Sequence, residues 1–422
     1  MIGAREAALL SLCDILYDGK YSNIAVNEML RKCHAMDRKD KSLYTTIVYG
    51  VLVHYYTLEY IISLYSSVKV KKLARYVKVL LLIGLYQIKY LDKVPDSAAV
   101  NESVKLSKRY CKKGSDRFVN AVLRRAIDGG SDIPMPDDEI ERICVEYSFS
   151  YQMAKQLCDI FGIERAVTLM ASLNMPPQTL LRPNVLKTDL NSLIDLLKGD
   201  GIEATEQDSM IAVKGFDIGN SVLYKDGYFT IQDRGAYTAS VVLDPQSGET
   251  IIDMCAAPGG KTTHIAELMG DSGKIIAFDI HEHKIKLIEN TAKRLGIKSI
   301  DAKTADATVY NPAHKESADR ILCDVPCSGW GIIRRKPDIK LSHTDLDDLY
   351  ITQKSILSNG AAYVKKGGCI VYSTCTLNSR ENEEVIREFL DNNNEFVKTY
   401  EKTFYPDTDN SDGFFICRLD RK

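Results

Sequence analysis

Three patterns are missing from this sequence of 422 residues, and each absence excludes a class of protein. No apolar run approaches the roughly 18 residues that a membrane-spanning helix needs, and Arg5 and Glu6 interrupt the start, where a signal peptide would be apolar. The eleven cysteines form no Cys-x-x-Cys pair, so neither a disulfide framework nor a structural zinc site is indicated. The Gly-rich P-loop pattern that cradles nucleotide phosphates is also absent. We therefore expect a cytoplasmic protein with no metal site and no membrane partner.

The net charge of -2 conceals an uneven distribution. Residues 1–130 contain 22 Lys and Arg against 12 Asp and Glu, a net charge of +10, and the remainder carries -12. A basic amino-terminal third that is rich in tyrosine suits a polyanionic partner such as RNA. The alternative is a solvated helical surface without a partner.

The apolar spacing divides the chain into four parts. Residues 1–130 have apolar positions at helical spacing almost throughout, which predicts an all-helical domain. Residues 131–175 begin with turn-forming residues and continue with helices at about 137–147 and 150–172. Residues 176–240 predict a small α+β, RRM-like subdomain that grips RNA, with Arg182 and Asn184 as candidate contacts to phosphate or sugar.

Residues 241–422 alternate strands with helices, which predicts a mostly parallel, doubly wound, Rossmann-like sheet. The expected strands lie at about 250–254, 274–279, 299–304, 319–324, 368–373, 395–399 and 413–419, and the expected helices at 260–269, 282–295, 345–365 and 379–390. Ligands of such sheets bind at the carboxyl ends of the strands. Polar residues gather there in this sequence, namely Asp253, Asp279, Asp306, Asp324 and Cys375.

The stretch 253–261 reads as a strand, a tight turn and the start of a helix. Gly259 and Gly260 remove two Cβ atoms where the backbone turns and a ligand approaches. The next strand ends in Asp279, at about the distance where such folds place the acid that binds ribose hydroxyls. Because 256–258 is a poor cradle for several phosphates, S-adenosylmethionine is the favoured cofactor.

Cys327 and Cys375 each leave a strand at this same expected edge, among small or polar residues. Carbon 5 of cytosine is too electron-poor to attack a methyl sulfonium, but a thiolate that adds at carbon 6 makes carbon 5 nucleophilic. Asp324 suits the acid that takes up charge near ring nitrogen 3 and the exocyclic amine. A base must then remove the carbon 5 proton, a step in which Cys327 could assist.

Three motifs resemble the NOL/NOP2/Sun family of RNA cytosine-5 methyltransferases. They are Asp-x-Cys-Ala-Ala-Pro-Gly-Gly-Lys at 253–261, Asp-x-Pro-Cys-Ser-Gly at 324–329 and Ser-Thr-Cys at 373–375. The helical part is similar to NusB-like RNA-binding domains, on residues 49–51, 83–87, 94–95, 101–102 and 118–124. The resemblance covers nearly the whole chain, and its catalytic motifs are more specific than its helical ones.

The resemblance implies a class I methyltransferase domain with defined roles for its residues. Cys375 would be the nucleophile, Cys327 the release residue, and Asp324 the contact to the methionyl group and the target base. The implied cofactor-binding residues are Cys255, Ala256, Ala257, Pro258, Gly259, Gly260, Lys261, Asp279, Asp306 and Asp324. The implied substrate is one loop cytosine of 16S rRNA, cytosine 967, outside the mature ribosome, in either free RNA or an assembly intermediate. We expect a monomer.

Three alternatives stay open at this stage. The enzyme could act on another RNA such as tRNA, or the chain could be a non-enzymatic, NusB-type RNA-binding or antitermination factor. DNA methylation is disfavoured by the NusB-like domain and the second cysteine. Four residues depart from the family pattern: Trp330, which could stack on a flipped base or fill a core, Val325 in place of Ala, and Arg234 and Ala236 where Glu and Ser are typical.

Overall fold

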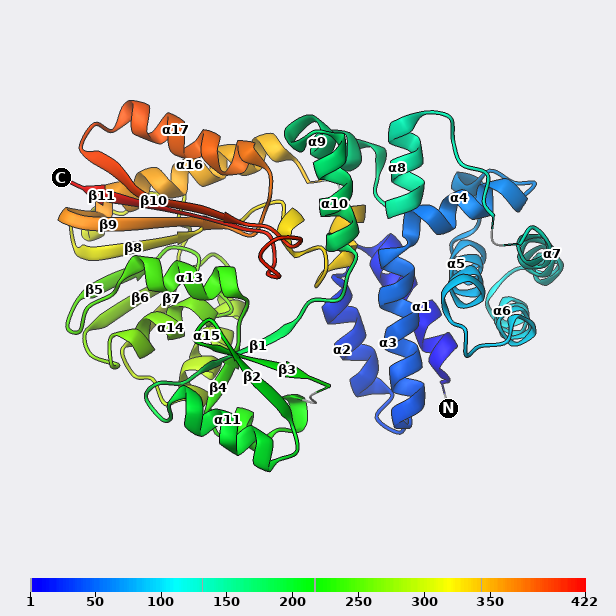
Figure 1. Cartoon of the computed structure of the whole chain (residues 1–422), viewed down its shortest axis with the longest axis horizontal. Coiled ribbons are helices and arrows are strands. Elements are labelled where there is room, and N and C mark those ends of the chain that lie inside the picture. Colours follow the sequence, from blue (N-terminus) through cyan, green and yellow to red (C-terminus); the bar gives the residue numbers. More distant parts are fainter. Residues whose placement is uncertain (1, 131, 216–217, 343) are drawn as a thin grey trace. The chain divides into compact units, whose positions relative to one another are not determined.

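The computed structural model of the chain describes residues 2–130, 132–215, 218–342 and 344–422. It divides into two compact units, which we describe separately (Figure 1). The first joins Met1–Asn174 with Arg335–His343, and the second joins Met175–Arg334 with Thr344–Lys422. The chain therefore passes between the units more than once.

The first unit is all-helical, as predicted. Its α-helices are α1 (Ala4–Asp18), α2 (Ser22–Lys32), α3 (Arg38–Val53), α4 (Tyr55–Tyr65), α5 (Arg75–Tyr90), α6 (Asp96–Tyr110), α7 (Ser115–Asp128), α8 (Glu139–Tyr147), α9 (Tyr151–Phe161) and α10 (Ile163–Leu173). α5 is the central helix, because every residue from Val79 to Gln87 is buried. A helix that is apolar on all sides belongs in the middle of a bundle.

The residues that carry the NusB resemblance pack against each other in this core. A Cβ on Gly50 of α3 would lie 1.9 Å from the ring of Tyr86 on α5, so only glycine allows this approach. A Cβ on Gly84 would similarly meet Leu123 of α7 at 2.7 Å. These motif residues thus set how closely the helices of the bundle cross.

One helix boundary differs from the prediction. The apolar pattern predicts a single helix over about 150–172, whereas the structure has α9 and α10 there. Gly162 separates them with a φ of 77°, a left-handed conformation that interrupts the helix. A periodic apolar pattern does not register a break at one glycine.

A short segment from later in the chain completes the helical unit. It contains the 3-10 turn η5 (Pro337–Leu341), and the side chain of Lys340 is almost fully buried. Lys340 Nζ donates to the carbonyls of Val53 and Ser148 and to Oδ1 of Asn174. Burial lowers the pKa of Lys340 well below its usual value. The segment lies inside the 241–422 range in sequence but packs with the helices.

Among the described residues, no single helix is long and apolar enough to cross a membrane. α3 and α4 are long and apolar enough only when they are taken together, and they are bent by 78° at their junction. Tyr44, Ile47 and Leu58 of these two helices are buried in the core of the bundle.

The second unit begins with a small four-stranded antiparallel sheet in the order β2-β3-β1-β4. Its elements are β1 (Thr179–Pro183), α11 (Leu190–Gly199), β2 (Glu203–Gln207), β3 (Met210–Lys214), α12 (Val222–Lys225) and β4 (Phe229–Ile231). This is the β-α-β-β-α-β arrangement of ferredoxin-like domains, to which RRMs belong. α11 covers one face of the sheet, and Leu180, Met210 and Ala212 on the other face pack with Tyr237. The sheet therefore presents neither face of its central strands to solvent.

The larger sheet has seven strands in the order β10-β11-β9-β8-β5-β6-β7. The strands are β5 (Thr250–Asp253), β6 (Lys274–Asp279), β7 (Ile300–Thr304), β8 (Ala318–Asp324), β9 (Val364–Thr374), β10 (Phe396–Phe404) and β11 (Phe414–Arg421). β7, β6, β5, β8 and β9 run parallel to one another, and β11 and β10 add an antiparallel edge next to β9. The predicted Rossmann-like, mostly parallel sheet is confirmed.

Helices cover both faces of this sheet (Figure 1). α13 (Arg234–Leu243), α14 (Gly260–Leu268) and α15 (Glu282–Leu295) pack on one face, and α16 (Leu346–Tyr363) and α17 (Glu383–Asn392) pack on the other. With both faces covered by helices, the carboxyl ends of the parallel strands are where a ligand of such a sheet is expected to bind.

Candidate functional site

The predicted site residues converge on one edge of the large sheet. Asp253, Asp279 and Asp324 are the last residues of β5, β6 and β8, and Cys375 directly follows β9. β8 and β9 are in register there, with Asp324 opposite Ser373. Asp306 lies just beyond the end of β7, at the same edge.

Two glycines shape the loop that follows β5. Gly259 has a φ of 100°, and a Cβ there would lie 3.2 Å from Cα of Ile288. No described heavy atom lies within 4 Å of where a Cβ on Gly260 would stand, so the first turn of α14 is open to a ligand. The amide of Ala256 donates to the carbonyl of Phe278 on β6 (2.7 Å), and the Ala257–Pro258 peptide bond is cis.

Asp253 lies beneath this loop, buried, and accepts a hydrogen bond from Thr262 Oγ1 (2.7 Å). Burial, together with the charge of nearby Asp324, raises the pKa of Asp253 to about 7. Asp253 thus fixes the loop to the helix that follows it, and its burial keeps it from direct contact with a ligand.

Two further carboxylates stand beside the loop. Asp279 is nearly buried and accepts a hydrogen bond from the amide of His281 (3.0 Å), with Lys284 Nζ at 3.7 Å. Asp306 is exposed and accepts from the amide and hydroxyl of Thr308. The exposed apolar side chain of Ile280, which follows Asp279, is a surface on which a purine ring could pack, and we did not single it out in the sequence.

Lys261 and Asp324 form an ion pair, with 2.7 Å between Nζ and Oδ2. The other oxygen of Asp324 accepts from Ser373 Oγ (2.8 Å). Burial alone would lower the pKa of Lys261, but the carboxylate of Asp324 outweighs it and raises that pKa above its usual value. Lys261 therefore carries a positive charge at the site, and Asp324 is held in one orientation.

The two cysteines lie in contact, with 3.1 Å between Sγ of Cys327 and Sγ of Cys375. The amide of Cys375 also donates to Cys327 Sγ (3.3 Å), and both residues are partly exposed. Its hydrogen bond to Cys375, together with burial, raises the pKa of the Cys327 thiol well above its usual value. Cys327 therefore keeps its proton, and its sulfur atom lies directly beside that of Cys375.

A set of buried polar residues beside the turn of Cys327 was not predicted from the sequence. The amide and hydroxyl of Ser328 donate to Glu381, and Gln353 Nε2 donates to the same carboxylate. Glu381 lies in the run Ser-Arg-Glu-Asn-Glu-Glu, which reads as an exposed charged surface. The only sequence signal was its closeness to Cys375.

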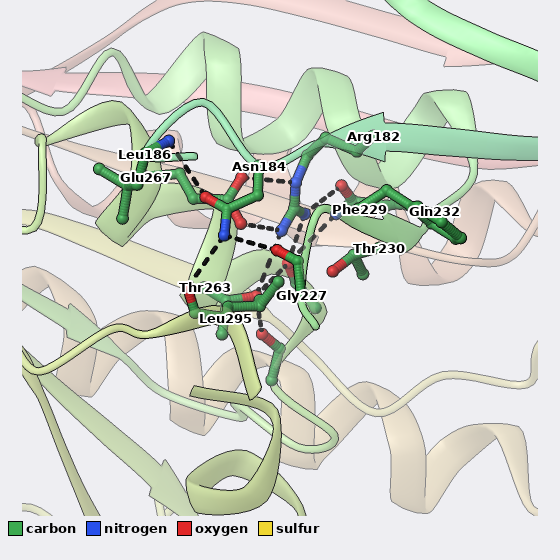
Figure 2. Close-up of polar contacts among 12 residues, drawn as sticks. Arg182, Asn184, Leu186, Gly227, Phe229, Thr230, Gln232, Thr263, Glu267 and Leu295 are labelled. Atoms are coloured by element: carbon green, nitrogen blue, oxygen red, sulfur yellow. Dashed lines mark hydrogen bonds and ion pairs between the residues drawn. The ribbon is translucent and has the colours of Figure 1, made fainter. Parts of the chain in front are cut away.

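The prediction that Arg182 and Asn184 contact RNA is wrong. Arg182 is 2% exposed and Asn184 is fully buried, and both face protein groups (Figure 2). Arg182 pairs with Glu267 of α14, and Asn184 Nδ2 donates to the carbonyls of Gly227 and Leu295. Both residues thus fasten the small sheet to the helices of the methyltransferase fold.

Two of the residues that depart from the family pattern, Trp330 and Arg234, have structural partners. Trp330 is only 5% exposed, so of the two alternatives the structure has it filling a core. Arg234 pairs with Asp208 and donates to the carbonyl of Asp409. Both side chains therefore contact protein.

Comparison with known proteins agrees with this architecture. The profile of the family described as 16S rRNA methyltransferase RsmB/F matches residues 240–420, and that of the NusB family matches residues 3–128. The chain is 36% identical to the probable ribosomal RNA small subunit methyltransferase B of Bacillus subtilis, over 99% of this chain and 98% of that one. It is 29% identical to ribosomal RNA small subunit methyltransferase B of Proteus mirabilis, over 99% and 98%.

The crystal structure of PH0851 superposes on 98% of this chain and 97% of that one, with 26% identity and a TM-score of 0.84. The similarity thus extends through both units, and the family expected from the motifs is confirmed. S-adenosyl-L-methionine is the cofactor of this methyltransferase fold. The chain belongs to the ribosomal RNA small subunit methyltransferase B family.

Proposed function

We propose that this protein methylates carbon 5 of one cytosine in 16S rRNA, cytosine 967, through a covalent adduct with Cys375. The observation that carries the proposal is the pair of thiols 3.1 Å apart at the carboxyl edge of the sheet. Cytosine-5 chemistry needs one sulfur to add to the ring, and a second group to assist its release. Two cysteines in contact at a cofactor edge supply both.

The cofactor loop supports the methyl donor. The small residues 256–260 and the carboxylates of Asp279 and Asp306 would hold S-adenosylmethionine, with Asp279 on the ribose hydroxyls and Asp306 near the adenine. When bound there, the cofactor supplies an electrophilic methyl group. The charged Lys261 and the fixed Asp324 lie where the loop meets the cysteine strands.

The protein residues then act in a defined order. The thiolate of Cys375 forms a bond to carbon 6 of the cytosine, and negative charge develops on the ring at nitrogen 3. Asp324 accepts a hydrogen bond from the exocyclic amine, and the positive charge of its partner Lys261 offsets the developing negative charge. Carbon 5 becomes nucleophilic and accepts the methyl group. A water molecule then acts as the base that takes the carbon 5 proton, and the electron pair of that C–H bond re-forms the double bond between carbons 5 and 6. The bond between sulfur and carbon 6 breaks and its electron pair returns to Cys375, with the protonated Cys327 thiol assisting beside the leaving sulfur.

The relatives support small-subunit rRNA as the substrate, because they are named for it and match this chain from end to end. The basic helical part, with its NusB profile, suits RNA binding. We place the reaction in the cytoplasm, on 16S rRNA that is not part of the mature ribosome, with a monomeric enzyme. DNA and membranes are not partners in this proposal.

The test is methyl transfer from labelled S-adenosylmethionine to a 16S rRNA fragment, compared with DNA of the same sequence. We expect label only in RNA and 5-methylcytosine as the sole modified nucleoside on digestion, with bisulfite sequencing placing it at cytosine 967. A tRNA substrate or a binding-only factor would each give a different result: label in tRNA alone, or binding without label.

Replacing Asp279 with Ala is expected to weaken cofactor binding roughly 10- to 100-fold, since hydrogen bonds to a charged acceptor contribute about 1.5–3 kcal/mol. Isothermal calorimetry on the intact protein measures this. Glu289→Ala removes an exposed carboxylate from α15 and should bind as tightly as the parent. An Asp279→Ala protein with unchanged affinity would contradict the ribose assignment.

A further inference from the structure

Glu381 is a carboxylate with no exposed surface, set in the 3-10 turn η6 (Ser379–Glu381) behind the two cysteines. It accepts three hydrogen bonds: Oε2 from the amide of Ser328 (2.8 Å) and from Gln353 Nε2 (3.0 Å), and Oε1 from Ser328 Oγ (2.5 Å). All three donors are neutral. A buried carboxylate is costly unless its charge is well solvated by such donors, so this group demands an explanation.

The three donors connect Glu381 to the turn that carries Cys327. Ser328 follows Cys327 directly, and Gln353 Nε2 also donates to the carbonyl of Pro326, which precedes it (3.0 Å). The carboxylate therefore holds this turn on both sides of the cysteine. Two of its bonds are direct and one passes through the side chain of Gln353.

A second set of contacts connects the same turn to the strand end of Cys375. Ser328 Oγ lies 2.8 Å from Oγ1 of Thr376, which follows Cys375. Because the single hydroxyl proton of Ser328 goes to Glu381, Thr376 is the donor in this contact. The backbone adds the bond from the amide of Gly331 to the carbonyl of Cys375 (3.0 Å). The two cysteine segments are thus tied together next to the thiols.

We propose that Glu381 is a positioning residue, which clamps the turn of Cys327 against the strand end of Cys375 and so sets the contact between the two thiols. This inference rests on the proposed function, in which Cys327 acts in release. The negative charge of Glu381 also contributes, after the Cys375 contact and burial, to raising the pKa of Cys327. Glu381 itself touches neither thiol in the hydrogen bonds described here.

Glu381→Gln tests the clamp with almost no change in volume. With its oxygen toward the N–H groups of Ser328 and Gln353, the amide turns its NH₂ group toward Ser328 Oγ, so that Ser328 must reverse its hydrogen bond with Thr376. The negative charge that strengthens all three bonds to Glu381 is also lost. The turn should move, so that release slows while addition by Cys375 continues. We expect kcat to fall at least 10-fold, the KM for RNA to stay within about 3-fold, and protein–RNA adduct to accumulate on a denaturing gel.

The control is Glu383→Gln, which removes an exposed carboxylate two positions further on and should leave turnover and adduct at parental levels. Cofactor affinity, measured by calorimetry with S-adenosylmethionine, shows whether the Glu381→Gln protein is folded. A folded variant should bind the cofactor normally, because the cofactor loop makes no described hydrogen bond to Glu381. If Glu381→Gln fails to bind cofactor, Ser328→Ala replaces it, since it removes one link to Glu381 and the contact to Thr376 and should shift release in the same direction.

The double variant Cys327→Ala/Glu381→Gln decides between a clamp and a merely structural role. A clamp that acts through Cys327 adds nothing once that thiol is gone, so the double variant should release RNA as slowly as Cys327→Ala alone. A further loss of turnover would overturn the inference, as would a Glu381→Gln enzyme within 2-fold of the parent. If Cys327→Ala itself traps no adduct, the proposed function fails, whereas trapping by Cys327→Ala but not by Glu381→Gln refutes only the clamp.

Discussion

Cys375→Ala is expected to abolish methyl transfer, with a loss of roughly 10⁴-fold or more, the scale on which removal of a covalent nucleophile acts. Without the thiol at 375 no bond to carbon 6 forms, and carbon 5 stays too electron-poor to take the methyl group. The initial rate of label transfer from S-adenosylmethionine to 16S rRNA measures the loss. Cofactor affinity should stay unchanged, which separates loss of chemistry from loss of folding.

Cys327→Ala should behave in the opposite way. Cys375 still adds and carbon 5 is still methylated, but the product leaves slowly, so RNA should remain attached to the protein on a denaturing gel. A loop cytosine should trap better than a paired one, because the target base must leave its stack at a cost of a few kcal/mol. Label transfer should stop after about one methyl group per enzyme.

The contact between the thiols makes this pair of variants informative. The two sulfur atoms are only 3.1 Å apart, so their positions alone do not say which one attacks. Cys33→Ala, at a half-buried position of the helical unit, is the matched control and should change neither turnover nor trapping. Adduct in Cys375→Ala but not in Cys327→Ala would reverse the assignment. Cys327, which follows Pro326, would then be the nucleophile, as the cysteine of the Pro-Cys motif is in DNA cytosine methyltransferases.

The sequence was enough to predict which residues meet at the sheet edge. Apolar runs predicted the strands, and in a parallel sheet every carboxyl end lies on one side, so Asp279, Asp324 and Cys375 had to come together. That rule needs only strand order and direction. It says nothing of which side chains touch.

Partners far apart in the chain could not be read from the sequence. Glu381 and Ser328 are 53 positions apart, and Arg182 and Glu267 are 85 apart. Residue type gives each side chain its bonding capacity, but only the packed fold selects the partner. Arg182 looked like a phosphate contact because most arginines are exposed, and here the fold buried it against a carboxylate.

Of the single substitutions that we predict in the second unit, one that breaks the pair of Arg182 and Glu267 should lower the free energy of unfolding the most. Nε and Nη2 of Arg182 donate to the two oxygens of Glu267 at 2.9 and 2.8 Å, and both side chains are at most 2% exposed (Figure 2). The remaining N–H groups reach Gln232 Oε1, the carbonyl of Gly260 and Thr263 Oγ1. All five donors of the guanidinium are therefore used.

Glu267→Gln removes the charge that compensates this buried cation, which should cost about 3–5 kcal/mol. For a unit of this size, that corresponds to a Tm lower by roughly 6–20 °C, measured by thermal melting of the intact protein. Glu401→Gln breaks the exposed pair with Lys398 and should cost under about 1 kcal/mol.

The double variant Arg182→Met/Glu267→Met should recover part of the stability lost in Glu267→Gln, because it leaves no unpaired charge in the interior. Since Arg182 also bonds the carbonyl of Gly260, where α14 leaves the cofactor loop, each single variant should weaken S-adenosylmethionine binding as well. A Glu267→Gln protein that melts within 2 °C of the parent would mean that water reaches this pair and that the small sheet is held to the methyltransferase helices by apolar packing alone.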